Sequence, residues 1–177
     1  MQFLHEGLSI IEPFVKHYGL WALFIIVYFE SLGAPLPGES ALVGASVLAI
    51  RGDLPIAGLF FAVWAGAVLG DSTGYLIGRV GGRRLLHRFG WLVKLTPERL
   101  AAFEDMFARK GAYIVLGARF VVVLRQLNGL IAGSMNMPWP KFLIANAIGG
   151  AAWVAVWGLG PYFFGDLFGV YALIRKQ

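Results

Sequence analysis

The most constraining feature of the sequence is FESLGAPLPGES, residues 29–40, in which a Gly/Pro run separates two glutamates, Glu30 and Glu39. Proline lacks a backbone N–H and its ring clashes with the preceding helical turn, so one regular helix cannot continue through this stretch. Apolar sequence lies on both sides, at residues 18–29 and 40–50. Each apolar piece is only about half as long as the roughly 20 residues that a helix needs to cross a bilayer.

Two short apolar helices joined by a proline-containing turn predict a re-entrant helical hairpin, with Pro35, Pro37 and Gly38 forming the turn. Irregular backbone at membrane depth is tolerated only where protein or a water-filled cavity surrounds it. Two alternatives stay open at this stage. The pieces could be ordinary helices joined by an external loop, or parts of one long, kinked span.

The composition supports a lipid environment. The chain of 177 residues is 58% hydrophobic and 14% charged, whereas soluble domains carry about 25% charged residues. Residues 1–17 lack a basic region followed by a clean apolar segment, so we expect no removable signal peptide. The absence of cysteine excludes disulfides and thiolate catalysis. These features predict an all-α integral membrane protein with a single domain over residues 1–177.

The positive charge is concentrated between Arg79 and Lys110 within a chain of net charge +5. Basic connecting segments remain on the cytoplasmic side of bacterial membranes. We therefore predict a cytoplasmic, amphipathic connector at about residues 81–110, containing a short surface helix with Thr96 as N-cap and Pro97 at its first position. Because this segment lies between spanning segments, we expect no nucleic-acid partner.

The segments before and after the connector repeat one pattern. Residues 56–77 form an apolar stretch long enough to cross, with glycines on one face for close helix packing. After the connector come an apolar run, Arg119 and Arg125, Asn128-Gly129, and a full crossing at about residues 142–159. One crossing in each unit, residues 18–80 and 111–165, predicts an inverted-topology repeat of two re-entrant hairpins and full transmembrane helices. Whether residues 160–177 also cross is left open.

Several of these motifs together resemble the DedA family, whose homologues include the eukaryotic VTT-domain lipid scramblases. The matching motifs, in chain order, are Glu30 with Pro35-Leu-Pro-Gly-Glu39, Gly70-Asp71 with Tyr75 and Gly78-Arg79, Arg119-Phe120 with Arg125, and Ala132-Gly133. The resemblance implies two facing hairpins in the bacterial cytoplasmic membrane. It also implies translocation of a membrane lipid, notably undecaprenyl phosphate, with dependence on the proton motive force.

The resemblance further assigns functional importance to Glu39, Asp71, Arg119 and Arg125. The chain departs from the family pattern in the second hairpin, where Val122, Val123, Gln126 and Ile131 replace the usual Pro, Gly, Thr and Pro. We therefore expect the second break at residues 126–129, with Gly129 as its turn residue.

The residue types suit this chemistry. A charge near the bilayer centre costs several kcal/mol, so intramembrane charges mark functional sites. The guanidinium fork matches phosphate oxygens, which makes Arg119 and Arg125 candidates for binding a lipid phosphate, with Asn128 and Glu39 beside them. Glu39, Asp71 and Glu30 are the candidates for proton exchange.

Other functions remain open. Glu39 and Arg125 could be a purely structural ion pair. The protein could be an energy-independent phospholipid scramblase, a membrane lipid phosphatase or a membrane-assembly factor. No phosphatase constellation of histidines and no metal cluster is apparent in the sequence, so we expect no enzyme activity, no metal and no cofactor. The expected partners are a membrane lipid and protons, and a small unit of this kind could form a homo-oligomer.

Overall fold

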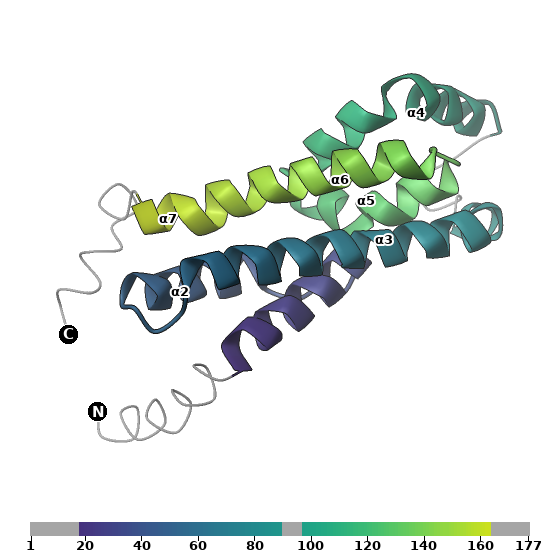
Figure 1. Cartoon of the computed structure of the whole chain (residues 1–177). Coiled ribbons are helices and arrows are strands. Elements are labelled where there is room, and N and C mark those ends of the chain that lie inside the picture. Colours follow the sequence, from purple (N-terminus) through teal and green to yellow (C-terminus); the bar gives the residue numbers. More distant parts are fainter. Residues whose placement is uncertain (1–17, 90–96, 164–177) are drawn as a thin grey trace.

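The computed structural model describes residues 18–89 and 97–163, which form helices joined by short turns. No strand occurs within these two ranges, which agrees with the predicted all-α class (Figure 1). The first helix covers Tyr18–Leu32. It is followed by α2 (Gly38–Ile50), α3 (Ile56–Phe89), α4 (Pro97–Ala118), α5 (Val122–Ser134), α6 (Trp139–Val154), a π-helical turn (Ala155–Leu159) and α7 (Gly160–Phe163).

Among the described residues, two helical stretches are long and apolar enough to cross a membrane, Ile56–Gly82 and Trp139–Leu159. They agree with the two crossings predicted from sequence. The first helix and α2 are apolar but shorter. We call these two helices and the non-helical residues 33–37 between them the first hairpin. Pro35 and Pro37 lie in this turn as predicted, and Gly38 begins α2.

The helices on both sides extend into the predicted connector, residues 81–110. α3 stays helical as far as Phe89, the last described residue before the gap. The residues after Gly82 include Leu and Arg, which are good helix formers. The predicted short surface helix is instead part of α4, which continues through Gly111 to Ala118. Thr96, the predicted N-cap, lies outside the described residues.

The second break also lies elsewhere than predicted. The chain turns at residues 119–121, where Val121 has extended backbone angles, and residues 126–129 lie inside α5. Gly129 is therefore not a turn residue. A Cβ on it would lie 3.0 Å from the backbone nitrogen of Tyr75, so this glycine allows α5 to approach α3 closely. We call α4, residues 119–121 and α5 the second hairpin.

The glycine face of α3 packs as predicted against neighbouring helices. A Cβ on Gly66 would lie 2.7 Å from the carbonyl oxygen of Phe24 in the first helix. A Cβ on Gly78 would lie 3.0 Å from the backbone nitrogen of Ser134 in α5. Small residues let helix backbones approach in this way. The first helix thus covers one part of this face and α5 covers the next.

The two hairpins approach α3 from opposite ends. In the first hairpin, Leu20 lies beside Gly58 near the start of α3, and Ser31 lies beside Gly70. In the second hairpin, α5 passes Asp71 with Gly129 and reaches Gly82 with Ser134. Both turns therefore lie near the middle of Ile56–Gly82 (Figure 1).

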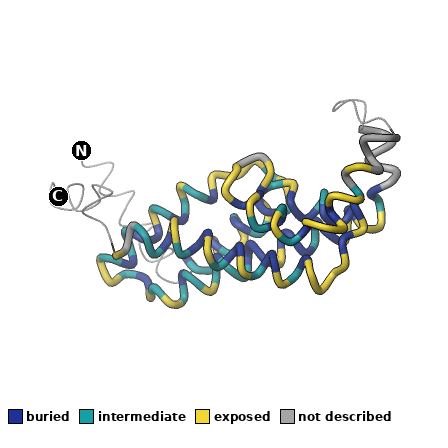
Figure 2. Tube along the Cα trace, turned by 90° about the horizontal axis from the view of Figure 1, so that it is seen from above, coloured by how far each residue is buried: buried dark blue, intermediate teal, exposed yellow. Residues whose placement is uncertain are grey.

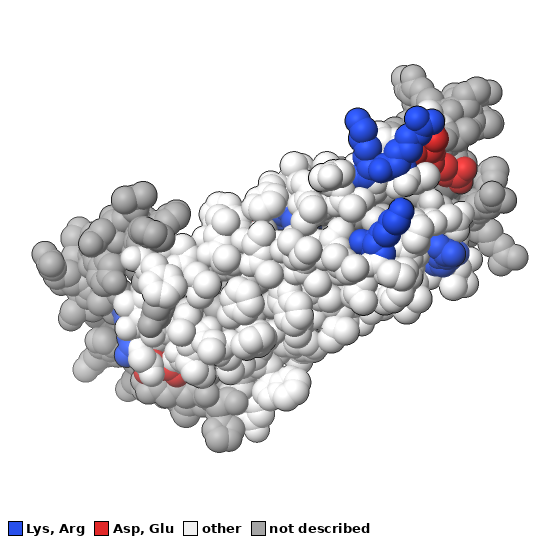
Figure 3. All heavy atoms as spheres, turned by 45° about the horizontal axis from the view of Figure 1, so that its top comes forward, with Lys and Arg blue, Asp and Glu red and all other residues white. Residues whose placement is uncertain are grey.

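The bundle is elongated, and buried residues follow its interior from end to end (Figure 2). One apolar cluster includes Leu42, Leu59 and Trp153, and a second includes Tyr75 and Phe142. Lys and Arg side chains gather at one end of the described surface (Figure 3). The exposed basic residues of α3, α4 and α6 include Arg79, Arg109, Lys110 and Lys141.

Candidate functional site

Arg125, in the first turn of α5, joins the turns of the two hairpins. Its Nη2 donates to Glu30 Oε1 at 2.8 Å, and its Nη1 donates to Glu39 Oε1 at 2.9 Å. Its guanidinium carbon lies 4.6 Å from the centre of the Trp153 ring, within the range of a cation–π contact. We call Arg125, Glu30, Glu39 and Trp153 the Arg125 cluster. One guanidinium thus bridges two carboxylates and rests on an aromatic face.

The local sequence of the first hairpin brings the two carboxylates together. Glu30 lies in the last turn of the first helix and Glu39 is the second residue of α2, so the short turn places them side by side. Glu30 Oε1 also accepts a hydrogen bond from the Gly38 N–H at 3.3 Å. A Cβ on Gly38 would lie 2.8 Å from the Glu30 carboxyl carbon. Glycine at position 38 therefore makes room for the Glu30 side chain.

The two carboxylates differ in their access to the surroundings. The side chains of Arg125 and Glu30 are 4% and 5% exposed, whereas that of Glu39 is 39% exposed. Arg125 therefore has one buried partner, Glu30, and one partly exposed partner, Glu39. An incoming anion could replace Glu39 without displacing Glu30.

A second arginine cluster lies deeper among the helices. Arg119, in the turn after α4, forms an ion pair with Asp71 of α3 and donates a hydrogen bond to the side-chain oxygen of Asn146 in α6. The Asn146 amide nitrogen donates in turn to the Val68 carbonyl at 3.3 Å. We call Arg119, Asp71 and Asn146 the Arg119 cluster. Each of its side chains is at most 1% exposed.

Several polar atoms at this depth have no hydrogen-bond partner among the described residues. They are Asp71 Oδ1, Arg119 Nε, Arg119 Nη1 and Trp153 Nε1. Buried polar groups in folded proteins are nearly always satisfied by protein or ordered water. The ring of Trp153 lies against Arg125, while its own N–H is among these unsatisfied groups.

The structure brings some of the predicted site residues together and separates others. Glu30, Glu39 and Arg125 meet, whereas Arg119 pairs with Asp71 instead of sharing one site with Arg125. Asn128 is buried and its amide nitrogen donates to the Val115 carbonyl at 3.3 Å, which joins α5 to α4.

Sequence reasoning missed two participants. Asn146 is a polar residue inside the apolar stretch 142–159, and that signal could have identified it. Trp153 is the second, and no sequence signal links it to Arg125.

Tyr75 and Arg79 hold a different part of the fold, the turn between α5 and α6. The Tyr75 hydroxyl donates to the Met137 carbonyl, and Arg79 Nη1 donates to the same carbonyl at 3.2 Å. The Tyr75 ring stacks on Phe142 with a centroid distance of 4.6 Å. These contacts fix the start of α6 against α3.

Comparisons with known proteins place this arrangement in a family. The VTT domain matches residues 36–169. An uncharacterized membrane protein of Synechocystis is 38% identical over 168 residues, which cover 95% of this chain and 77% of the relative. The DedA protein of Escherichia coli is 30% identical over 172 residues, covering 93% and 78%. This chain belongs to the DedA family.

Other DedA-family relatives are also named as membrane proteins. An uncharacterized membrane protein of Mycobacterium tuberculosis is 42% identical over 144 residues, which cover 79% of this chain and 66% of the relative. No solved structure matches this chain. With two candidate spans of its own, this DedA-family chain is a membrane protein.

Proposed function

We propose that this DedA-family protein translocates an anionic lipid across the bacterial cytoplasmic membrane as a transporter and not as an enzyme. The family resemblance favours undecaprenyl phosphate as the substrate. The observation that carries the proposal is Arg125, which holds the half-exposed Glu39 where the turns of the two hairpins meet.

The proposed membrane arrangement has several spans. Ile56–Gly82 and Trp139–Leu159 cross the bilayer, and the two hairpins enter it from opposite sides as an inverted repeat. The position of both turns near the middle of α3 supports this arrangement. Surrounding helices would satisfy the non-helical backbone of the turns at that depth. The end that carries the exposed basic residues faces the cytoplasm, in keeping with the positive-inside rule.

In the proposed mechanism, a lipid phosphate competes with Glu39 for Arg125. Guanidinium N–H groups donate to phosphate oxygens as they donate to carboxylates. Glu30 stays on Nη2 and holds the guanidinium in place while Nη1 changes partner. Once released from Arg125, Glu39 can take up a proton, and it gives the proton up when the phosphate leaves. This exchange would couple lipid movement to the proton gradient.

The Arg119 cluster has a different part in this proposal. Asp71 is fully buried on Arg119, so it could exchange a proton only after the pair separates. We therefore assign the first proton step to Glu39. Arg119 and Asp71 hold the turn of the second hairpin against α3.

The test uses purified protein in liposomes that contain fluorescent undecaprenyl phosphate or, separately, fluorescent phosphatidylethanolamine. Leaflet accessibility is followed with and without a pH gradient for the wild type and for Arg125→Ala. The matched control is Arg109→Ala, because Arg109 forms an exposed ion pair with Asp105 at 3.0 Å. We expect gradient-accelerated movement of the polyprenyl phosphate in the wild type and in Arg109→Ala, and its loss in folded Arg125→Ala.

Three other results would each replace the proposal. Movement of both lipids regardless of the gradient would indicate a scramblase. Release of inorganic phosphate from the lipid would indicate a phosphatase. Absence of any lipid movement in the folded wild type would favour an assembly role, with Arg125 as a structural link between the hairpins.

A further inference from the structure

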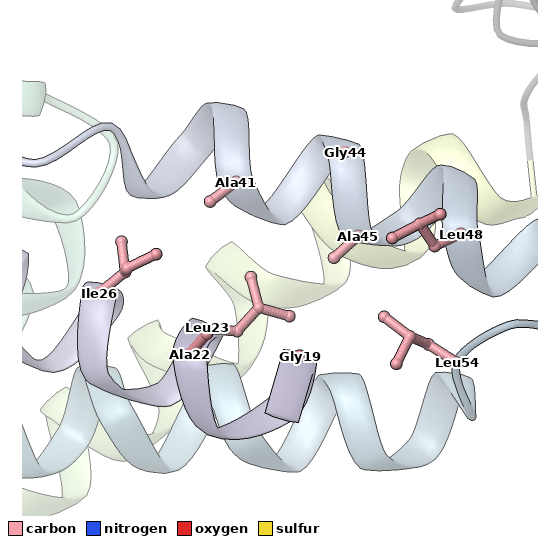
Figure 4. Close-up of a pocket in the computed structure, with 9 residues that line it drawn as sticks. All are labelled: Gly19, Ala22, Leu23, Ile26, Ala41, Gly44, Ala45, Leu48 and Leu54. Atoms are coloured by element: carbon pink, nitrogen blue, oxygen red, sulfur yellow. The ribbon is translucent and has the colours of Figure 1, made fainter. Parts of the chain in front are cut away.

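An apolar groove runs between the two helices of the first hairpin (Figure 4). Its volume is about 250 Å³, and its walls consist of glycine, alanine, leucine and isoleucine. Ala22 and Gly44 on opposite walls are exposed, so the groove opens to the outside of the bundle. Its lining includes Gly19, Ala22 and Ile26 from the first helix and Ala41, Gly44 and Leu48 from α2.

Gly44 lies beside open space, unlike the glycines at which two helices pack closely. A Cβ on Gly44 would meet nothing within 4 Å, whereas one on Gly133 of α5 would lie 2.9 Å from the Arg79 backbone nitrogen. Glycine inside a helix is less favourable than alanine, and no described neighbour requires it at position 44. The glycine therefore keeps space open between the two helices.

The chemistry of the walls determines what can fill this space. A cavity without polar groups offers water no hydrogen-bond partners, and an unfilled cavity forfeits dispersion contacts along its lining. A hydrocarbon chain needs no hydrogen-bond partners and restores the dispersion contacts of the lining. Small side chains on both walls give such a chain room between two backbones that lie on either side of it.

The groove leads to the Arg125 cluster. Ile26 lies four residues before Glu30 and therefore on the same helix face, one turn away. On the opposite wall, Ala41 lies in the same helical turn as Glu39, although the two side chains lie on different faces of α2. A charged site and an apolar groove in series complement a ligand that has an anionic head and a hydrocarbon chain. A helix from a second copy of the protein would complement only the apolar part.

We propose that this groove binds the hydrocarbon chain of the lipid whose anionic headgroup binds Arg125. This inference rests on the proposed function and adds the location of the lipid tail. It makes the first hairpin the element that recognises the hydrocarbon chain, while the first turn of α5 supplies the arginine for the headgroup.

Photolabelling of the full chain in phosphatidylcholine vesicles tests the inference. The probes are phosphatidylglycerol and phosphatidylcholine that carry the same diazirine-bearing acyl chain, and labelled peptides are mapped by mass spectrometry. The variants are Gly44→Phe, which fills the groove, and Gly117→Phe as its control. Gly117 is also an exposed helical glycine whose Cβ would meet nothing within 4 Å. If Gly44→Phe does not fold, Ala22→Phe fills the groove from the opposite wall.

We expect the anionic probe to label residues 18–50 more strongly than the neutral probe in the wild type and in Gly117→Phe. Gly44→Phe should lose this excess. Equal labelling by both probes would show contact with bulk lipid only and would overturn the inference. Stronger labelling by the anionic probe that persists in Gly44→Phe would also overturn the inference. So would a Gly44→Phe variant that loses a dimer and is otherwise unchanged.

The liposome assay separates this inference from the proposed function. Lipid translocation by a wild type that shows no headgroup-dependent labelling would remove the tail site and leave the proposed function standing. Headgroup-dependent labelling in a wild type that moves no lipid would support the tail site and remove the transport function.

Discussion

The Arg119 and Arg125 clusters use the same pairing of arginine with carboxylate, but they differ in access. Arg119, Asp71 and Asn146 are all fully buried and connect α3, α6 and the turn after α4. In the Arg125 cluster, Glu39 is 39% exposed while its neighbours are closed. A charge pair that is closed on all sides offers no surface that a ligand can reach. A pair with one partly exposed partner can exchange that partner for a ligand, and we propose that this difference gives the two clusters different roles.

Removal of Arg119 should give the largest loss of stability. Arg119→Ala leaves Asp71 buried without its counter-charge, and breaking a buried pair in this way costs about 3–5 kcal/mol. Chemical unfolding in detergent, followed by tryptophan fluorescence, measures the loss. Arg109→Ala is the control, because its ion pair is exposed and contributes about 0–1 kcal/mol.

A double variant sharpens this prediction. Replacing both Asp71 and Arg119 with leucine and methionine removes the uncompensated charge, so it should recover most of the stability lost in Arg119→Ala. A double variant as unstable as Arg119→Ala would show that the loss does not come from the unpaired charge of Asp71. The hydrogen bonds and packing of the pair would then account for the stability that this cluster contributes.

Gly129→Ala should have an intermediate effect, because Gly129 links the two clusters. It lies on α5 with Arg125 and contacts the backbone of α3 at Asp71. An added methyl group would push these helices apart, and overpacking of this kind costs about 1–3 kcal/mol. Gly117→Ala is the control and should be neutral or slightly stabilising, since a Cβ there meets open space. Equal unfolding midpoints for the two variants would refute the close approach of α5 to α3.

The sequence predicted the parts of the fold that depend on local pattern. Apolar length identified Ile56–Gly82 and Trp139–Leu159 as spans, and the prolines identified the first turn. The second turn was misplaced because residues 119–121 contain neither proline nor glycine, and the glycine nearby serves helix packing instead.

The site was predicted by residue type but not by pairing. Arg119 and Arg125 are close in sequence, yet the turn and first residues of α5 direct them to different carboxylates. Local pattern carries no information on which distant carboxylate an arginine reaches, because that depends on how α3 and the first hairpin pack. The contribution of Trp153 was missed for the same reason.

Glu39→Gln should have the smallest effect on stability and still abolish coupled transport. The glutamine keeps the shape of the side chain, Arg125 keeps Glu30, and the lost ion pair is partly exposed, so the cost should be about 0–1 kcal/mol. Glu30→Gln is the matched control. Glu30 is buried and accepts hydrogen bonds from both Arg125 and Gly38, so its neutralisation should cost about 1.5–3 kcal/mol. Unfolding midpoints and gradient-dependent lipid movement, measured on the same preparations, decide whether Glu39 contributes to stability or to coupled transport. If Glu39→Gln is as destabilising as Glu30→Gln, Glu39 has a structural role like that of Asp71 in the Arg119 cluster. Lipid transport by Glu39→Gln with an unchanged response to the pH gradient would also exclude Glu39 as the proton-exchanging residue.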